Sequence, residues 1–420
     1  MFRHTFARPR AIRARLTLLG LFAIVGPAIV SGFADNDAGG ITTYSIAGAQ
    51  FGYDLLWVLL ASQLALMVTQ EAGARLGLAT GHGLSGLIRE RYGVRWAAFA
   101  VMTMLAANLG DTVAEFAGIG AALSLFGVPI QVSALLSAIG MVALLARANY
   151  RRIQVVFVLV GVAVSIAYAI SAVLARPDWG RAVGSLVLPH GQVTSSAYIL
   201  TVVGVVGTTI TPWGQSFIQS YVIDKGLGAK DLLGSRIDVT LGAFLTNVVA
   251  GFIVVACAAT LWTNGVLVND AADAARALGP LAGPAATTLF AAGLLAASLL
   301  GLGTVPLTSA YAACEAFGLE AGLDHRWTDA RSFYSLLAFF VGFAALFVLI
   351  PGLPLIAVLF LSQVFDGLLL PIILVFVMLL ARDRQLMGDL RSGFVTASLG
   401  WTVTIAIGVL SIALVLTQVL

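Results

Sequence analysis

The stretch Ala34-Asp35-Asn36-Asp37-Ala38-Gly39-Gly40 interrupts the first long apolar run of this chain, and Thr208-Thr209-Ile210-Thr211-Pro212-Trp213-Gly214 interrupts a later one. A carboxylate in hydrocarbon costs about 2.5–3.5 kcal/mol on insertion scales, so it is normally retained for a function. Backbone that leaves the helix at membrane depth is tolerated only where it is buried in protein or lines a cavity. Broken helices in corresponding halves of a chain indicate a transporter's binding site. The two interruptions therefore predict a membrane protein that moves a small solute.

The overall composition excludes a soluble protein. Of the 420 residues 60% are hydrophobic and 10% are charged, and the mean hydropathy is +0.99, whereas a soluble domain carries about 25% charged residues. The net charge of +3 comes from basic residues dispersed among short loops, so no nucleic-acid partner is expected. Cys257 and Cys314 lie in apolar segments and are expected to be small core residues. No nucleotide loop, catalytic Ser/His/Asp set or zinc-ligand spacing occurs, so we expect neither an enzyme nor a resident cofactor, and no protein partner is implied.

Apolar windows predict an all-α protein with eleven membrane-spanning helices in a single transmembrane domain over residues 1–420, after a basic cytoplasmic tail at 1–15. The run from Leu16 continues through the first interruption to about Gln50 without a convincing cleavage site, so we expect a retained helix rather than a signal peptide. The predicted helices cover residues 16–50, 54–75, 96–124, 128–147, 153–175, 197–223, 236–262, 284–314, 332–350, 354–381 and 393–419.

The distribution of basic residues predicts the orientation in the bilayer. With a cytoplasmic N-terminus, every lysine and arginine falls on the cytoplasmic side except Arg176, Arg181 and Arg276. This asymmetry follows the positive-inside rule. The chain is therefore expected to be a multi-pass protein of the cell membrane, with the C-terminus extracytoplasmic.

The two interruptions lie five predicted helices apart. Helices one to five (16–175) and six to ten (197–381) are groups with an odd number of members, so the two groups have opposite orientations in the membrane. This is the inverted-repeat arrangement of transporters with two discontinuous helices. Helix eleven (393–419) is expected to lie outside the repeat.

The first interruption carries an acidic side chain where the backbone can leave the helix. Gly39 and Gly40 give the backbone that freedom, so Asp37 can project toward the interior of the bundle. The alternative is that Asp37 only caps the second half of the first helix. The roles of Asp35 and Asn36 stay open, because either can be a cap or line the vestibule.

The second interruption supplies further oxygen atoms. Pro212 has no N–H and so frees a carbonyl near residue 208, and Thr211 adds a hydroxyl. Freed carbonyls, a hydroxyl and the Asp37 carboxylate together make a hard-oxygen site that suits a small cation.

Several motifs together resemble those of the Nramp metal-ion transporters, over nearly the whole chain. They are Asp37-Ala38-Gly39-Gly40-Ile41, Ala47-Gly48-Ala49-Gln50-Phe51-Gly52-Tyr53, Leu55-Leu56-Trp57, Gln70, Ala74-Arg75-Leu76-Gly77, Gly81, Ala114-Glu115 with Gly118, and Ser362-Gln363-Val364. The resemblance implies a LeuT-like fold with a 5+5 inverted repeat and discontinuous helices one and six, and a divalent metal ion as substrate.

The departures from the Nramp pattern indicate which metal ion the site prefers. Nramp proteins carry Asp-Pro-Gly-Asn in helix one and Met-Pro-His in helix six; here Ala38, Gly40, Thr211 and Trp213 stand in place of the proline, asparagine, methionine and histidine. Replacing a soft thioether by a hydroxyl makes the site harder and wider, and Mg²⁺ usually keeps several waters. The pattern therefore resembles the Nramp-related magnesium transporters, which also carry Mn²⁺. The resemblance implies metal contacts by Asp37, the Thr208 carbonyl, Thr211 and Gln363, while Gly40 marks the lost ligand.

The same departures put proton coupling in doubt. Trp213 is expected to line the ion pathway, because it follows the second interruption. It replaces an imidazole, and indole cannot titrate near neutral pH. Nramp proteins place an aspartate three residues before the glutamate of helix three, where this chain has Thr112; Asp111 is adjacent but turned by about 100° around the helix. We predict facilitated entry without proton coupling, driven by about 2.3 kcal/mol per charge per 100 mV.

Other carboxylates have two interpretations each. Asp111 and Glu115 lie one turn apart and either line an acidic ion path or are structural hydrogen-bonding groups. Glu71 is expected to pair with Arg75 at i+4. Asp238 is expected to cap a helix or take part in gating. The roles of Glu315 and Asp366 stay open between membrane-end and bundle-facing positions.

Three alternative functions remain. The first is a proton-coupled Mn²⁺/Fe²⁺ symporter of the Nramp type. The second is a LeuT-fold transporter of organic solutes, although Asp37 would repel a substrate carboxylate. The third is a membrane sensor or scaffold that transports nothing, for which the sequence shows no soluble output domain.

Overall fold

The computed structural model of the chain describes residues 36–419, other than 147–149, 188, 190, 192, 225 and 323–326. The predicted tail 1–15, the first half of the predicted helix 16–50 and Asp35 therefore lie outside the described residues. The first described residues, Asn36 and Asp37, directly precede the helix α2 (Ala38–Phe51).

Every regular element among the described residues is helical, as predicted. After α2, the described residues contain eleven helices of 13 residues or more. They correspond to the ten predicted spans two to eleven, because the sixth span is divided into α9 and α10. The long helices after α2 are α3 (Leu56–Thr80), α5 (Val94–Ser124), α6 (Ile130–Ala146), α7 (Tyr150–Leu174), α9 (Ser196–Thr209), α10 (Pro212–Asp224), α11 (Leu232–Thr260), α14 (Ala286–Phe317), α15 (Arg331–Phe347), α16 (Leu355–Ala381) and α18 (Phe394–Val419).

Length and composition single out the helices that can cross a membrane. Within the described residues, six helical stretches are long and apolar enough, and three apolar helices are shorter. The six are Val94–Ser124, Ser196–Ser220, Ala229–Asn264, Ala271–Phe317, Leu355–Ala381 and Phe394–Gln418. The count of eleven spans stays a prediction.

Short helices occupy the connections between the long ones. Between α11 and α14, an α-helical turn (α12, Ala271–Ala275) passes into a 3₁₀ turn (η3, Arg276–Leu278). The other short elements are α4 (Leu84–Tyr92), α8 (Trp179–Gly184), η1 (Ala229–Asp231), η2 (Trp262–Asn264), α13 (Gly279–Ala282), η4 (Gly283–Ala285), α17 (Arg384–Met387) and η5 (Gly388–Leu390).

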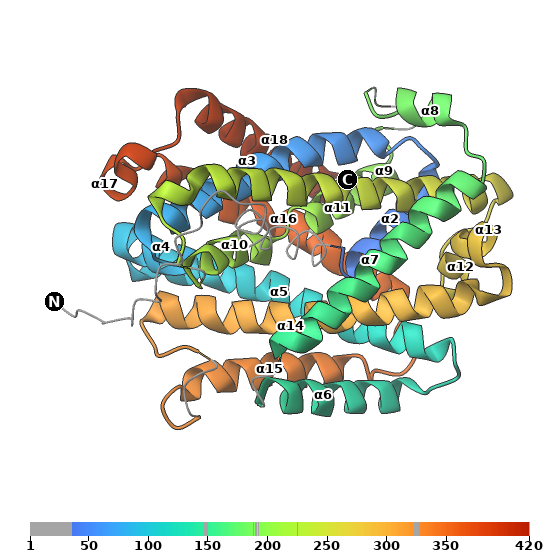
Figure 1. The fold of residues 1–420 in the computed structure, drawn as a ribbon, viewed down its shortest axis with the longest axis horizontal. Helices are drawn as coiled ribbons and strands as arrows, with labels where there is room; N and C mark the ends of the chain where they lie inside the picture. The colour runs from blue at the N-terminus through green and yellow to red at the C-terminus, as the bar shows by residue number, and fades with distance from the viewer. Residues whose placement is uncertain are drawn as a thin grey trace.

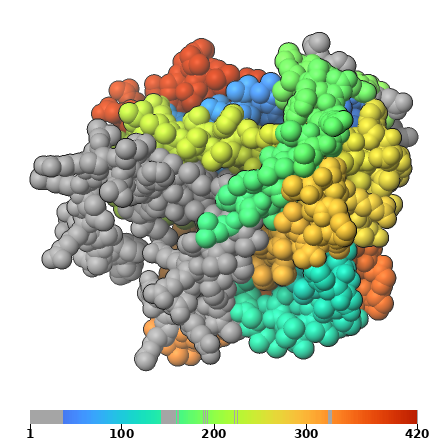
Figure 2. Space-filling model, turned by 45° about the vertical axis from the view of Figure 1, so that its right-hand side comes forward, coloured from blue at the N-terminus to red at the C-terminus, as the bar shows by residue number. Residues whose placement is uncertain are grey.

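The long helices form a bundle in which α5, α6, α11, α14 and α15 run roughly along one direction (Figure 1). The helix α7 crosses them obliquely and packs on α11 and α14, as the space-filling view also shows (Figure 2). In the interior, α5 packs against α14 and α16, and α16 packs against α9 and α2. These interior helices carry the groups described below.

The predicted break in the sixth span is confirmed. The helix α9 ends at Thr209, Ile210 leaves the helical conformation with φ −125° and ψ 77°, and α10 begins at Pro212. Proline cannot donate to the preceding turn but suits the first position of a helix. The sequence Thr211-Pro212 therefore ends one helix and begins the next.

Glycines bring the interior helices into backbone contact. A Cβ on Gly207 would collide with the backbone carbonyl of Gln363, and one on Gly367 would collide with the carbonyl of Val203. Small residues at such positions let membrane helices approach closely. The end of α9 is thereby held directly against the middle of α16.

Candidate functional site

Asp37 lies at the start of α2 and caps it. Its Oδ1 accepts a hydrogen bond of 2.7 Å from the Gly40 N–H, and its side chain is only 2% exposed. The capping role that we kept as an alternative is therefore real. It does not use up the carboxylate, which has two oxygens with about four acceptor positions.

Gln363 on α16 connects three interior helices. Its Nε2 donates to Oδ1 of Asp111 at 3.2 Å and to the Ser362 hydroxyl at 3.1 Å. A Cβ on Gly39 would collide with the same amide, and Gly207 packs on the Gln363 backbone. The predicted ligand Gln363 thus lies between the first turn of α2, the end of α9 and the middle of α5.

Asp111 and Glu115 lie on one face of α5, as their spacing predicts, and both are buried. The Glu115 carboxyl interacts with that of Asp37 and lies near the Ala38 backbone N–H. Its other side packs on α14, because a Cβ on Gly301 would collide with it. The structure therefore brings Asp37, Asp111 and Glu115 together around the start of α2.

Asp366 joins this group, although its position was left open above. It is fully buried, and its carboxyl interacts with those of Asp111 and Asp37. The available signal was its spacing from Gln363, since residues i and i+3 lie on the same side of a helix. We call Asp37, Asp111, Glu115 and Asp366 the carboxyl cluster.

Thr208 and Thr211 lie on either side of the break between α9 and α10. The Thr211 hydroxyl caps α10 by accepting a hydrogen bond from the Gly214 N–H at 3.2 Å, and the Thr208 hydroxyl is buried without a partner. The bond of 3.0 Å between the Tyr44 and Thr209 hydroxyls joins the end of α9 to α2. The two breaks therefore lie in neighbouring parts of the interior, as a shared site requires.

Trp213 is fully buried in an apolar cluster with Leu300 and Val305 of α14, and its ring meets that of Phe217 at 5.7 Å between centroids. Its indole N–H has no hydrogen-bond partner. A part for Trp213 in the ion path stays a prediction.

The carboxylates outside the cluster have other surroundings. Glu71 pairs with Arg75, as predicted, and also with Arg236 of α11, whose Nε lies 2.8 Å from its Oε1. The capping role predicted for Asp238 is wrong, because α11 begins at Leu232 and Asp238 lies in its second turn. Glu315 lies against Gly83, at the far end of α14.

The ligand types limit what the interior can bind. In the described part of the chain, no group of three or more His, Cys, Asp or Glu side chains is arranged to hold a metal ion. A cation there would need backbone carbonyls, amide oxygens, hydroxyls or water in addition to carboxylate. This is the hard-oxygen donor set that the breaks provide.

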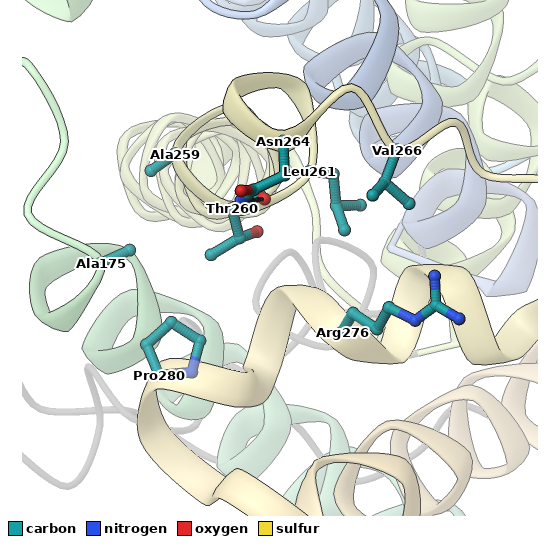
Figure 3. Close-up of a pocket in the computed structure, with 8 residues that line it drawn as sticks. All are labelled: Ala175, Ala259, Thr260, Leu261, Asn264, Val266, Arg276 and Pro280. Atoms are coloured by element: carbon teal, nitrogen blue, oxygen red, sulfur yellow. Dashed lines mark hydrogen bonds between the residues drawn. The ribbon is translucent and has the colours of Figure 1, made fainter.

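A surface pocket of about 410 Å³ lies elsewhere, between the ends of α7 and α11 and the segment from η3 to α13 (Figure 3). Thr260, Asn264 and Arg276 supply its polar atoms. None of its lining residues is among the predicted site residues, so we assign the pocket no part in transport.

Solved structures define the class of the fold. The crystal structure of MhsT in complex with L-phenylalanine matches with a TM-score of 0.61 and 17% identity, over 94% of this chain and 98% of that one. A manganese transporter of Eremococcus coleocola, solved with an aromatic bis-isothiourea substituted compound, matches with a TM-score of 0.75 and 21% identity, over 94% of this chain and 86% of that one. The fold is therefore the all-α, LeuT-like fold of multi-pass membrane transporters.

Sequence comparison identifies the family. The model described as natural resistance-associated macrophage protein-like, Nramp, matches residues 28–417. The chain therefore belongs to the Nramp family. One relative, the divalent metal cation transporter MntH of Deinococcus radiodurans, is 31% identical over 415 residues, which cover 96% of this chain and 90% of the relative.

Proposed function

We propose that this protein carries divalent metal cations through the cell membrane, with Mg²⁺ as the main substrate and Mn²⁺ as a second one, and that entry is not coupled to protons. The observation that carries the proposal is the buried Asp37 carboxyl at the start of α2, beside Gln363 and Glu115 and next to the break between α9 and α10. A relative named as a divalent metal cation transporter supports a divalent ion.

The preference for Mg²⁺ follows from the chemistry of the ligands. Thr211 stands where the Nramp pattern has a methionine, so the site lacks the thioether that favours transition metals. Gly40 stands where the pattern has an asparagine, and its hydrogen atom leaves space for water. Mg²⁺ loses its waters reluctantly and is bound through one or two carboxylates. Asp37 supplies one.

The absence of proton coupling rests on Trp213 and Thr112, which replace titratable residues of the Nramp pattern. One observation favours the alternative of a proton-coupled Mn²⁺/Fe²⁺ symporter. Asp111, Glu115 and Asp366 are buried side chains that can each carry a proton. The experiment below separates the two mechanisms.

The proposal also includes the orientation of the chain in the membrane and its division into two inverted repeats. The basic residues support a cytoplasmic N-terminus and an extracytoplasmic C-terminus, and the breaks support inverted repeats at 16–175 and 197–381. An organic solute is a weaker candidate, because the likeness to MhsT concerns the fold alone and Asp37 repels a substrate carboxylate.

Uptake into proteoliposomes tests the function. We expect purified protein to move both Mg²⁺ and Mn²⁺ inward under a negative internal potential, while a pH-sensitive dye inside stays constant. Uptake restricted to transition metals would contradict the Mg²⁺ preference. Internal acidification in step with metal entry would show the proton-coupled mechanism instead. Uptake of an organic cation without metal flux would show a transporter of organic solutes.

A further inference from the structure

The carboxyl cluster has many hydrogen-bond acceptors and few donors. Both oxygens of Glu115 and of Asp366, Oδ2 of Asp111 and Oε1 of Gln363 make no hydrogen bond. The four side chains are at most 1% exposed. A buried acceptor without a partner costs about 1–3 kcal/mol, and more if it is charged. The cluster therefore fits a ligand that is positively charged and rich in donors.

The described part of the chain offers no such partner nearby. Among the described residues, Arg75 is the only basic side chain that is buried, and it pairs with Glu71. The Asp111 and Asp366 carboxyls instead face each other between α5 and α16, with the carboxyl of Asp37 within electrostatic reach. Two carboxylates in this arrangement repel each other when both are ionised, and a bound cation relieves that repulsion.

The unpaired atoms surround the predicted ion position rather than forming a separate one. The Gln363 amide joins Asp111 to the first turn of α2, which Asp37 caps. The described residues contain no group of three or more acidic, His or Cys side chains that could hold an ion directly. Acceptors that lie around an ion without ligating it are suited to its bound water, because each water donates two hydrogen bonds.

We propose that Asp111 and Asp366 are outer-sphere acceptors, which take hydrogen bonds from water that stays on the transported cation while Asp37 contacts the ion. This inference rests on the proposed cation transport. It makes the two aspartates specificity-determining residues: an ion that keeps its waters satisfies their oxygens, whereas an ion that sheds them leaves the oxygens unpaired. Neither aspartate belongs to the Nramp motifs that this chain shares.

Ion selectivity tests the proposal. Asp111→Asn and Asp366→Asn keep the side-chain size but remove the charge and one acceptor. We expect Mg²⁺ uptake into proteoliposomes to fall about tenfold, in the range seen for outer-shell partners of metals, and Mn²⁺ uptake to fall less than about threefold. The retained Mn²⁺ uptake shows that the variants fold. Asp329→Asn, at an exposed carboxyl between α14 and α15, is the matched control and leaves both rates unchanged.

Equal loss of both ions, or no loss of either, would overturn the outer-sphere role while leaving the proposed function intact. Wild-type protein that moves neither ion would overturn both. These outcomes are distinguishable in the same assay.

An inert complex ion gives a second measurement. Hexaamminecobalt(III) does not exchange its ligands, so it can bind only through hydrogen bonds from its outer surface. We expect it to inhibit wild-type Mg²⁺ uptake and to need about a tenfold higher concentration for half-inhibition of Asp366→Asn. Asp329→Asn behaves as wild type. Failure to inhibit the wild type, or equal inhibition of Asp366→Asn, would contradict the inference.

Discussion

Two groups of buried or half-buried acidic side chains in this protein differ in their partners. In the second half of α3, Glu71 lies between Arg75 and Arg236, so its negative charge has basic partners. In the carboxyl cluster, four acidic side chains meet with no basic partner among the described residues. The paired Glu71 carboxylate is a structural link between α3 and α11. A group of carboxylates in a membrane interior that has no basic partner among the described residues is suited to binding a cation.

Removing the Asp37 carboxylate is expected to have the largest effect, and it tests whether the carboxyl cluster binds the ion. We expect Asp37→Ala to reduce Mg²⁺ and Mn²⁺ uptake to below about 1% of wild type, because a direct ligand contributes more than the 10–100-fold of outer-shell partners. Proteoliposome uptake measures it, with Asp329→Asn as the control. Substantial uptake by Asp37→Ala would show that Asp37 is only a helix cap.

Changing the ligand type at residue 211, without changing the charge, tests how the second break sets the ion preference. Thr211→Met restores a soft thioether at the second break, so we expect the ratio of Mg²⁺ to Mn²⁺ uptake to fall about tenfold. Thr263→Met, at an exposed threonine in η2, controls for the added methionine. An unchanged ratio would mean that residue 211 does not contact the ion.

Close packing around Gln363 is the next point to test. A Cβ on Gly207 meets backbone atoms of α16, which cannot move aside as a side chain can. We expect Gly207→Ala to destabilise the protein by about 1–3 kcal/mol, the range for overpacking, and to slow uptake. Thermal unfolding in detergent measures the loss. Gly251→Ala in α11, where a Cβ meets nothing within 4 Å, is the matched control and is expected to be as stable as wild type.

The smallest effect is expected in the paired group. Glu71→Gln removes the ion pairs to Arg75 and Arg236 but no oxygen near the predicted ion. We expect uptake within about twofold of wild type and a melting temperature lower by about 2–4 °C. A loss of uptake as large as that of Asp37→Ala would remove the distinction between the two groups.

The sequence was sufficient for the break in the sixth span, because local residues decide it. Pro212 removes an N–H within a run of threonines, whereas Pro306 and Pro371 lie inside the continuous helices α14 and α16. The i, i+4 pair of Glu71 and Arg75 was predictable for the same reason. The first break was predicted from Gly39 and Gly40, and the described residues confirm the start of α2 and the cap by Asp37, but they do not include the preceding half.

The remaining features depend on contacts between distant segments. Asp366 in isolation is one acidic residue in an apolar helix, and only the packing of α16 on α5 brings it to Asp111. Arg236 joins Glu71 across 165 positions of sequence. The error at Asp238 arose because α11 begins earlier than its apolar pattern, at the polar turn η1. Such features require the three-dimensional arrangement of the helices.

The most direct test of the central claim is to locate a bound ion. Mn²⁺ scatters X-rays anomalously, so a crystal of the protein soaked in Mn²⁺ shows where the ion lies. We expect an anomalous peak between the Asp37 carboxylate and the Thr208 carbonyl, near Gln363, that is missing in Asp37→Ala. A peak only at another position, or an unchanged peak in Asp37→Ala, would contradict the account.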